Sequence, residues 1–132
     1  MNISSKEACM KTVVGIDNGT QSTKVIFYDI ENHRITAIGR SSHDLISNDK
    51  GRREQKAEWW LQALRECFAQ IDPQIKQSAV ALGVSGQQHG LVPLDADGAP
   101  VYNVKLWNDT ETAAECAEIT AAFGGEEQLI RQ

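Results

Sequence analysis

The sequence predicts an α/β fold in which a three-stranded antiparallel meander is followed by a helix and a further strand. Residues 12–42 contain three short runs rich in β-branched and aromatic residues, separated by polar turns. Residues 56–71 repeat apolar side chains at intervals of three and four, which is typical of an amphipathic helix. Residues 79–84 are a continuous apolar run, which is typical of a strand buried on both faces. A sheet with helices packed on it buries all three patterns.

The composition limits the chain to one domain and excludes several classes of function. Its 132 residues are 41% hydrophobic, which suffices for a single core. A net charge of -5 argues against nucleic acid and against an anionic membrane surface as partners. No apolar run approaches the roughly 20 residues that a bilayer requires, and the N-terminus lacks the apolar core of a signal peptide.

Three cysteines, Cys9, Cys67 and Cys116, have neither metal-ligand spacing nor an obvious disulfide pattern. Cys67 and Cys116 fall within helical patterns, so we expect both to be buried, reduced thiols. Reduced thiols indicate a cytoplasmic protein.

The first two predicted strands, residues 12–17 and 22–29, enclose a tight polar turn. Residues 13–29 read Val-Val-Gly-Ile-Asp-Asn-Gly-Thr-Gln-Ser-Thr-Lys-Val-Ile-Phe-Tyr-Asp. The hydroxyls, backbone N–H groups and lysine of such a turn can hold a nucleotide phosphate, and the acid at its rim can hold Mg²⁺ through water. Glycine-rich phosphate loops lead into helices, whereas a β-branched and aromatic run follows here. An ordinary hairpin with a polar tip explains the turn equally well.

The next elements complete the first layer. Residues 35–42 alternate apolar and polar side chains and predict the third strand. Residues 45–55 are polar and predict a long surface connection. The helix at residues 56–71 has one apolar face, so it lies on the sheet, and Pro73 ends it after Asp72.

Polar residues follow the last strand of the predicted sheet. Residues 85–90 read Ser-Gly-Gln-Gln-His-Gly, a pattern typical of ligand contacts at the end of a buried strand. Residues 91–94 and 101–106 flank an Asp-Gly step and predict a second hairpin. A helix capped by Asp109 or Thr110 is expected to run to about Phe123 and to end at two glycines. Residues 128–132 begin another helix.

In this order, the elements resemble the first half-domain of the FGGY carbohydrate kinases, which have the ribonuclease-H-like, actin-like ATPase fold. Three motifs carry the resemblance: residues 15–20 (Gly-Ile-Asp-Asn-Gly-Thr), 83–90 (Gly-Val-Ser-Gly-Gln-Gln-His-Gly) and 106–110 (Leu-Trp-Asn-Asp-Thr). Glu54-Gln55 and Glu58-Trp59-Trp60 add a weaker fourth. The resemblance covers residues 12 to about 120. It implies the N-terminal portion of the first kinase domain at residues 12–132, and the polar residues 1–11 before it predict a loose leader.

Within the family, the chain is most similar to the xylulokinases, which carry Gly-Gln-Met-His-Gly at residues 86–90. Glycerol kinases carry Arg-Glu where this chain has Gln88 and His89, so glycerol is the poorer candidate substrate. Gln88 replaces the methionine of the xylulokinases, and Asn18 stands where leucine or glutamine is usual. Either departure can signal a different ketose or polyol.

The resemblance implies roles for the residues of the first turn. Asp17 resembles the acid that holds Mg²⁺ through water, and capping of the tight turn is the alternative. The residues that resemble the family's ATP phosphate contacts are Thr20, Gln21, Ser22 and Lys24. Lys24 can equally be a solvated lysine at a strand edge.

The resemblance also implies four sugar contacts: Gln88, His89, Trp107 and Asp109. A neutral His89 can both donate to and accept from sugar hydroxyls, whereas His33 and His43 lack such a setting and are expected on the surface. Gln88 either donates to the sugar or braces its loop. Trp107 either forms an apolar wall or packs in the core. For Asp109, capping of the last helix explains the residue better than a sugar contact.

The function implied is transfer of the γ-phosphoryl group of ATP to a hydroxyl of a ketose or polyol, xylulose above all. ATP, Mg²⁺ and a small sugar are the implied ligands, and a homodimer is an open expectation for the complete protein. The family's catalytic aspartate lies beyond residue 132, so no general base is expected here and the isolated chain should be inactive. One alternative is a non-catalytic sugar- or nucleotide-binding fragment derived from such a kinase. A ribonuclease-H-like nuclease is another, against which the acidic balance argues.

Overall fold

The computed structural model describes residues 10–131 and divides into two units. Among the described residues, the first unit comprises residues 10–44 and Ala57–Gln88, and the second comprises Leu45–Lys56 and residues 89–131. Most of the predicted leader and Cys9 lie outside the described residues. No helix among residues 10–131 is long and apolar enough to cross a membrane.

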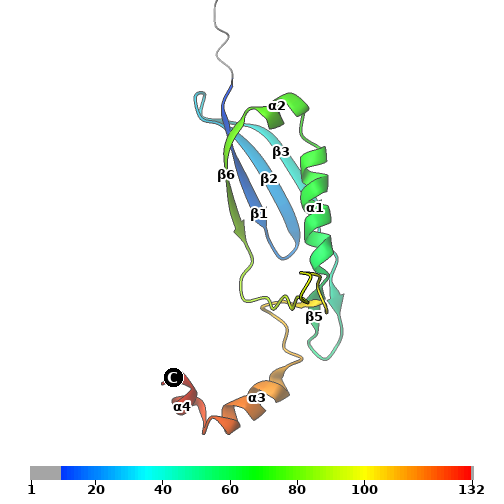
Figure 1. Cartoon of the computed structure of the whole chain (residues 1–132), viewed down its shortest axis with the longest axis vertical. Helices are drawn as coiled ribbons and strands as arrows, with labels where there is room; N and C mark the ends of the chain where they lie inside the picture. Colours follow the sequence, from blue (N-terminus) through cyan, green and yellow to red (C-terminus); the bar gives the residue numbers. More distant parts are fainter. Residues whose placement is uncertain (1–9, 132) are drawn as a thin grey trace, which may run out of the picture. The chain divides into compact units, whose positions relative to one another are not determined.

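A four-stranded sheet forms the first unit, in the order β3-β2-β1-β6 (Figure 1). Its strands are β1 (Thr12–Asn18), β2 (Ser22–Asp29), β3 (Arg34–Ser42) and β6 (Ala79–Gly86). The first three pair antiparallel in sequence order, whereas β6 pairs parallel to β1. The predicted α/β meander is therefore confirmed.

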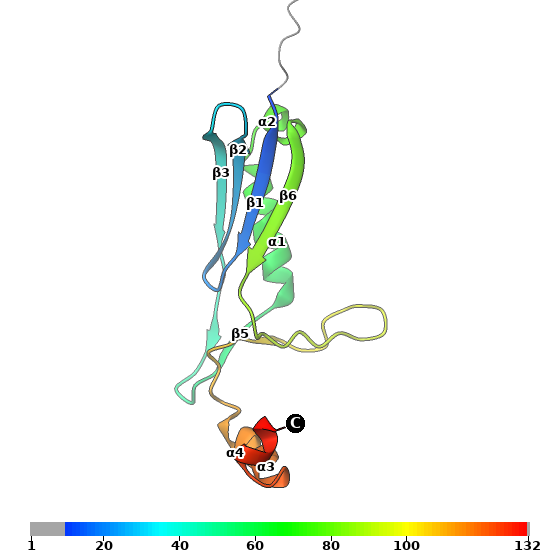
Figure 2. The ribbon, with the colours of Figure 1, turned by 90° about the vertical axis from the view of Figure 1, so that its left-hand side faces the viewer.

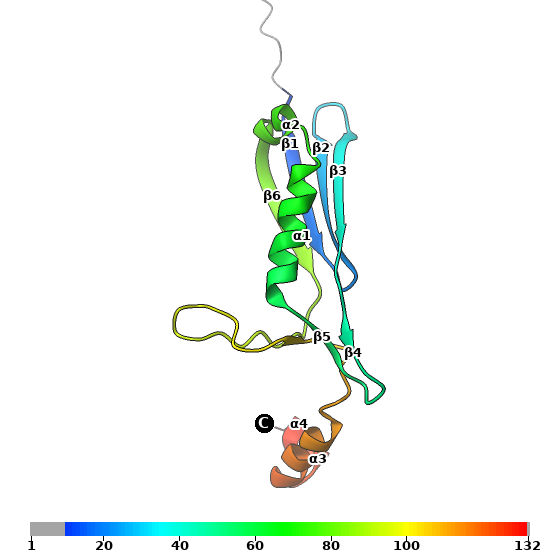
Figure 3. The same cartoon turned by 90° about the vertical axis from the view of Figure 1, so that its right-hand side faces the viewer.

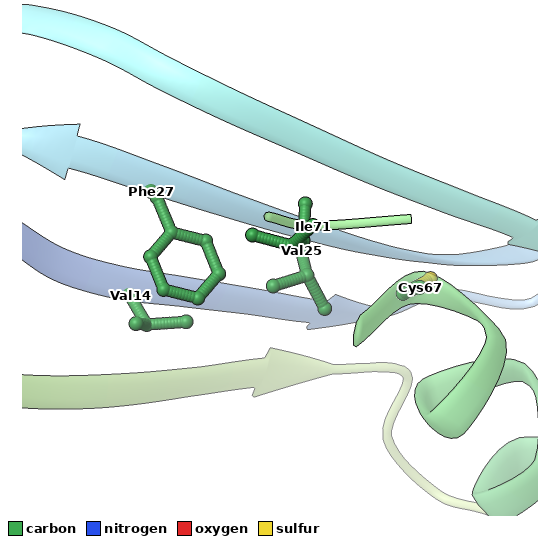
Figure 4. Close-up of a cluster of buried hydrophobic side chains, with 5 residues drawn as sticks. All are labelled: Val14, Val25, Phe27, Cys67 and Ile71. Atoms are coloured by element: carbon green, nitrogen blue, oxygen red, sulfur yellow. The ribbon is translucent and has the colours of Figure 1, made fainter. Parts of the chain in front are cut away.

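One face of this sheet is covered by α1 (Ala57–Ala69), as Figure 3 shows. In Figure 2 the opposite face is turned toward the viewer, and no described element of the first unit covers it. Every second residue of β2 is buried from Thr23 to Asp29, which follows from the period of two in a strand. The core gathers Val14, Val25, Phe27, Cys67 and Ile71 (Figure 4).

Pro73 begins a helix as well as following one. The short α2 (Pro73–Gln77) has Asp72 as its N-cap, whose Oδ1 accepts a hydrogen bond from the N–H of Gln74 at 2.7 Å. Proline is favoured at the first helical position because its missing N–H has no partner there in any case. The prediction of a simple stop therefore missed this element.

The expectation that residues 79–84 are buried on both faces is wrong for the described chain. Val80, Leu82 and Val84 are 59%, 66% and 68% exposed. The reason is that β6 is the edge strand and α1 packs on β2 and β3. The apolar run indicated a strand correctly, but it could not indicate what covers it.

The second unit has a small antiparallel sheet in the order β4-β5-β7. Its elements are β4 (Ile46–Ser47), β5 (Arg53–Gln55), β7 (Val104–Lys105), α3 (Ala113–Ala122) and α4 (Glu126–Ile130). The long surface connection expected at residues 45–55 contains two short strands, β4 and β5. The expected second hairpin is reduced to β7, two isolated bridges and a turn at Gly98, whose φ is +81°.

Two further expectations about this unit need correction. α3 begins after Thr112, so neither Asp109 nor Thr110 caps it. Cys116 is exposed rather than buried, whereas Cys67 of the first unit is fully buried as expected. The predicted glycine ending is confirmed, because Gly124 has φ +87° and the N–H of Gly125 donates to the carbonyl of Thr120 at 2.9 Å.

Candidate functional site

The β1–β2 turn, residues 19–21, is closed by a short backbone hydrogen bond and tied to the segment after β6. The N–H of Gly19 donates to the carbonyl of Ser22 at 3.1 Å. Thr20 Oγ1 donates to Gln87 Oε1 at 3.1 Å, and the N–H of Gln87 donates to the carbonyl of Asn18 at 3.0 Å. The turn therefore has a defined shape before any ligand arrives.

Asp17 and Lys24 lie opposite each other beside this turn. In the β1–β2 register Asp17 faces Lys24, while Ser85 on β6 faces Asp17 and Arg40 on β3 faces Lys24. Residues directly opposite on neighbouring strands point to the same face. Because Thr23 and Val25 of β2 point toward α1, this row of polar side chains lies on the uncovered face.

A hollow of about 530 Å³ lies on the uncovered face beside this row. Its lining residues are Gly15, Ile16, Asp17, Lys24, Ile26, Gly83, Val84 and Ser85. Gly15 and Gly83 face each other in the register, and a Cβ at Gly15 would come 3.0 Å from Ile26. Glycine at both positions therefore opens the hollow, and a carboxylate and an ammonium group stand at its rim.

His43 supports the turn from the α1 side of the sheet, which the sequence did not reveal. His43 is half-buried rather than at the surface. Its N–H donates to the carbonyl of Gln21 at 2.8 Å, and its Nε2 lies 2.9 Å from Thr23 Oγ1. The sequence offered one clue to this position: His43 directly follows β3. The last residue of β3, Ser42, pairs with Ser22, which directly follows the turn.

In the second unit, Trp107 and Asp109 follow β7 in very different surroundings. Trp107 is 61% exposed, which excludes the alternative that it packs in the described core. The side chain of Asp109 is only 2% exposed. Its Oδ2 accepts from the N–H of Arg53 at 2.8 Å and its Oδ1 from the N–H of Glu111 at 3.0 Å. Asp109 thus holds a backbone turn in place of the helix cap predicted for it.

Charged side chains gather around Asp109. Lys105 Nζ lies 3.1 Å from Glu54 Oε1, 3.3 Å from Asp109 Oδ2 and 3.6 Å from Glu111 Oε2. Arg52 Nε completes the group by donating to Glu111 Oε2 at 2.7 Å. We call these five residues the charged cluster.

The charged cluster shifts the pKa values of its own members. The Arg52 guanidinium, followed by the Asn48 amide, lowers the pKa of Glu111 to about 2. Burial raises the pKa of Asp109, but the backbone N–H groups of Arg53 and Glu111, together with Lys105, outweigh it and lower the pKa. Burial likewise opposes a charged Lys105, yet its carboxylate partners raise its pKa. All these shifts favour the charged forms.

Carboxylate oxygens of Glu54, Asp109 and Glu111 lie within 4.8 Å of one another, a spacing that a metal ion can use. Lys105 Nζ already lies among these oxygens and supplies the compensating positive charge. The cluster is therefore an ion-pair network, and its geometry gives no reason to assign a metal to it.

The other predicted sugar contacts are exposed. Gln88 ends the first unit and His89 opens the last segment of the second. His89 has φ +61°, a left-handed conformation that is uncommon outside glycine and is concentrated at functional sites. Two residues later, the N–H of Leu91 donates to the carbonyl of Lys105 at 3.2 Å in an isolated antiparallel bridge. His89 lies two residues before Leu91 and Trp107 two residues after Lys105, so both lie beyond the same end of this bridge.

The predicted site residues thus fall into two groups. The first unit brings together the predicted metal and phosphate residues: Asp17, Thr20, Gln21, Ser22 and Lys24. The second unit holds the predicted sugar residues His89, Trp107 and Asp109. The first group consists mainly of hydroxyls, an acid and a cation, whereas the second includes an exposed indole and an exposed imidazole.

Comparison with known proteins identifies a consistent set of relatives. Residues 12–132 match the family described as the FGGY family of carbohydrate kinases, N-terminal domain. The chain is 42% identical over 126 residues to a xylulose kinase of Haemophilus influenzae, a match that covers 90% of this chain and 26% of the relative. A xylulose kinase of Streptomyces coelicolor is 41% identical over 113 residues, covering 86% of this chain and 23% of the relative.

Solved structures give the same result. The ligand-bound xylulose kinase of Lactobacillus acidophilus matches with a TM-score of 0.75 at 26% identity, over 93% of this chain and 25% of that one. The chain therefore spans about a quarter of the length of the relatives it matches.

Proposed function

Because the chain belongs to the FGGY family of carbohydrate kinases, we propose that it forms the N-terminal part of an ATP-dependent kinase that phosphorylates a ketose, xylulose above all. The main observation that supports this proposal is that Asp17 and Lys24 face each other across β1 and β2, next to a turn rich in hydroxyl groups. Phosphoryl transfer needs positioning and charge stabilisation more than covalent chemistry, and this arrangement offers both.

In this proposal the β1–β2 turn binds the ATP phosphates. Backbone N–H groups of the turn and the hydroxyl of Ser22 act as donors to phosphate oxygens, with Lys24 as a point charge. The hydroxyl of Thr20 shapes the turn by donating to Gln87 Oε1. Asp17 fits Mg²⁺, because it is an exposed carboxylate at the rim of the hollow, and Mg²⁺ prefers few carboxylates and several waters. When bound, Mg²⁺ supplies neutralisation of charge on the transferred phosphoryl group.

The sugar contacts in this proposal are Gln88, His89 and Trp107. Exposed Trp107 offers an apolar wall for the C–H face of a sugar, and His89 offers a ring nitrogen as donor or acceptor. Asp109 contributes by holding the Trp107 segment, since its oxygens are already used by Arg53, Glu111 and Lys105. The group that takes the proton from the sugar hydroxyl comes from the part of the relatives' length that this chain does not span.

The proposal is tested by replacing the matching residues of the Haemophilus influenzae xylulose kinase with this chain. We expect the chimera to phosphorylate D-xylulose, and the 132-residue chain alone to show no turnover. In the chimera, Asp17→Asn should lower turnover about 100-fold with little change in sugar binding, because the acid serves the metal and the phosphates. Asp97→Asn, at an exposed turn residue, is the matched control.

Coupled measurement of ADP release and calorimetric titration of D-xylulose separate the two roles. The proposal fails if a chimera with a normal melting transition is inactive on D-xylulose. Unchanged turnover in Asp17→Asn would remove that residue from the phosphate site.

A further inference from the structure

Three hydrogen-bonded, uncharged and partly buried side chains lie on the α1 side of the β1–β2 turn: Asn18, Thr23 and His43. Thr23, on β2, is 1% exposed. Its hydroxyl donates to Asn18 Oδ1 at 2.9 Å and also lies 2.9 Å from His43 Nε2. A hydroxyl has one proton, so Thr23 accepts at the second contact and His43 must donate. The geometry therefore assigns the proton of His43 to Nε2.

The other ring nitrogen of His43 has the opposite surroundings. Nδ1 is buried and has no hydrogen-bond partner among the described residues. A proton on Nδ1 would create a charged, buried donor, which is costly without a partner. Burial accordingly lowers the pKa of His43, while backbone groups of Thr20 and Gly19 act in the opposite direction. Both observations favour the neutral ring.

His43 also holds the turn through its backbone. Its N–H donates to the carbonyl of Gln21, within the turn, at 2.8 Å. Its side chain reaches Asn18, the residue before the turn, through Thr23. One residue thus fixes the turn at both of its ends.

We propose that His43 is a positioning residue for the β1–β2 turn and orients the donors of residues 19–22 that contact phosphate. Its neutral imidazole, protonated at Nε2, sets the Thr23 hydroxyl, which in turn sets Asn18. The identity of the ligand rests on the proposed function, whereas the support of the turn by His43 does not. His43 itself touches no ligand in this arrangement.

The charged groups around His43 do not provide a competing explanation. Asp44 follows it in the chain, and Glu66 on α1 accepts a hydrogen bond from Ser41 Oγ at 2.6 Å. Both line a hollow beside Trp59. No charged side chain among the described residues contributes to the pKa shift of His43. The support is therefore made of neutral hydrogen bonds.

The first test is an NMR measurement on the 132-residue chain. Imidazole ¹⁵N shifts report which nitrogen carries the proton. We expect a neutral His43 with its proton on Nε2 at pH 7, and amide signals of residues 18–23 that follow its titration and not that of exposed His33. A proton on Nδ1, or turn amides that ignore the titration of His43, would overturn the inference.

The second test compares variants that keep or remove the donor. His43→Gln can donate from its side-chain amide, whereas His43→Leu fills the site without a donor. His33→Asn is the matched control, at an exposed histidine whose φ of +51° asparagine tolerates. We expect the turn amides to shift in His43→Leu and to stay near the parent in the other two. If His43→Leu does not fold, the inference is still tested by the position of the ring proton in the parent and by the turn amide signals of His43→Gln, which should stay near those of the parent.

Titration with Mg²⁺ and inorganic triphosphate links the turn to its ligand. We expect His43→Leu to weaken binding about fivefold, the effect of one misplaced hydrogen bond, and His43→Gln to bind within about twofold of the parent. The inference would be overturned if His43→Leu bound triphosphate as tightly as the parent and its amide signals at residues 18–23 matched those of the parent. If the parent itself does not bind triphosphate at residues 19–22, the proposed phosphate site fails, while the turn shifts still decide the role of His43.

Discussion

The two regions that carry the predicted ligand contacts are held by opposite kinds of interaction. The β1–β2 turn is supported by uncharged groups, with Thr23, Asn18 and His43 linked at 2.9 Å on one side and Thr20 bonded to Gln87 on the other. The Trp107 segment is instead held by the charged cluster around Lys105. The difference follows from how much backbone pairing each region has.

Long strands make the turn of the first unit a continuation of the sheet. β1 and β2 pair over seven successive positions, so the ladder fixes the turn and side chains only refine it. In the second unit, β5 has three residues and β7 has two. A ladder this short supplies few hydrogen bonds, and isolated short pairings are marginal in water. Ion pairs between side chains therefore supply what the backbone does not.

The largest expected effect tests whether the first unit depends on close uncharged packing. Gly39→Ala places a Cβ against the carbonyl oxygen of Cys67 on α1, where there is no room for it. We expect it to lower the free energy of unfolding by about 3 kcal/mol, because α1 must move off β3. Urea titration followed by circular dichroism measures the change.

Gly83→Ala is the matched control, because a Cβ there meets nothing within 4 Å and the residue is also in a strand. It should change stability by less than about 0.5 kcal/mol. Equal effects in the two variants would show that the packing of α1 on β3 does not limit stability.

The next effect tests the charged cluster. Glu54 is 1% exposed and accepts from both Lys105 and Asn103, so Glu54→Gln leaves a partly buried ammonium with one carboxylate fewer. We expect a loss of about 2 kcal/mol in the free energy of unfolding, less than the roughly 3–5 kcal/mol for breaking a buried ion pair, because Asp109 still faces Lys105. Hydrogen exchange read by mass spectrometry should locate the loss in residues 104–111.

Glu115→Gln, at an exposed position on α3, provides the comparison for loss of a carboxylate alone. It should leave exchange in residues 104–111 unchanged. If Glu54→Gln behaves in the same way, the cluster does not hold the Trp107 segment.

The sequence predicted best what depends on neighbouring residues. The meander, α1 and the start of β6 follow from local periodicity, which the alternating burial of Thr23, Val25 and Phe27 reproduces. The hairpin between β1 and β2 followed from residue types and from the family motif, and its role in phosphate binding stays a prediction. Pro73 was interpreted only as a stop because its role at the start of α2 depends on the cap supplied by Asp72.

Features that depend on distant partners could not be predicted. Glu54 and Lys105 are 51 residues apart in sequence, so neither suggests an ion pair with the other. His43 is half-buried only because the β2–β3 register brings it level with the turn. The exposure of β6 depends on which elements lie beside it, and an apolar run does not contain that information.

A smaller effect is expected when the hydrogen bonds between Thr23, Asn18 and His43 that support the turn are removed. Thr23→Val keeps the shape of the buried side chain but leaves Asn18 Oδ1 and His43 Nε2 without the hydroxyl between them. We expect a loss of about 1 kcal/mol, the usual contribution of a hydrogen bond. Urea titration measures it, and Ser42→Ala at an exposed position on β3 should change stability by less than half as much. If Thr23→Val left the free energy of unfolding unchanged, the backbone pairing of β1 and β2 alone would fix the turn.

The smallest effect separates the two regions by pH. The pKa of His43 is lowered below 6.5 by burial, so the unfolded chain binds the proton more readily and the free energy of unfolding falls as the pH drops through 6.5. The pKa of Glu111 is lowered from 4.5 to about 2, so its contribution is complete above pH 4.5 and is lost as the pH falls toward 2. The turn should therefore weaken in mild acid, where the charged cluster is still intact.

Unfolding in urea at half-unit steps from pH 8 to pH 3 tests this separation with two variants. His43→Gln removes the titrating ring, so it should flatten the stability profile between pH 7 and 5 and leave the acid limb unchanged. Glu111→Gln should reduce the slope of the acid limb and leave the region near neutrality unchanged, because its carboxylate is fully ionised there. A profile in which His43→Gln alters only the acid limb would show that His43 does not enter the folded protein as a neutral ring, and the contrast between the two regions would then not extend to their response to pH.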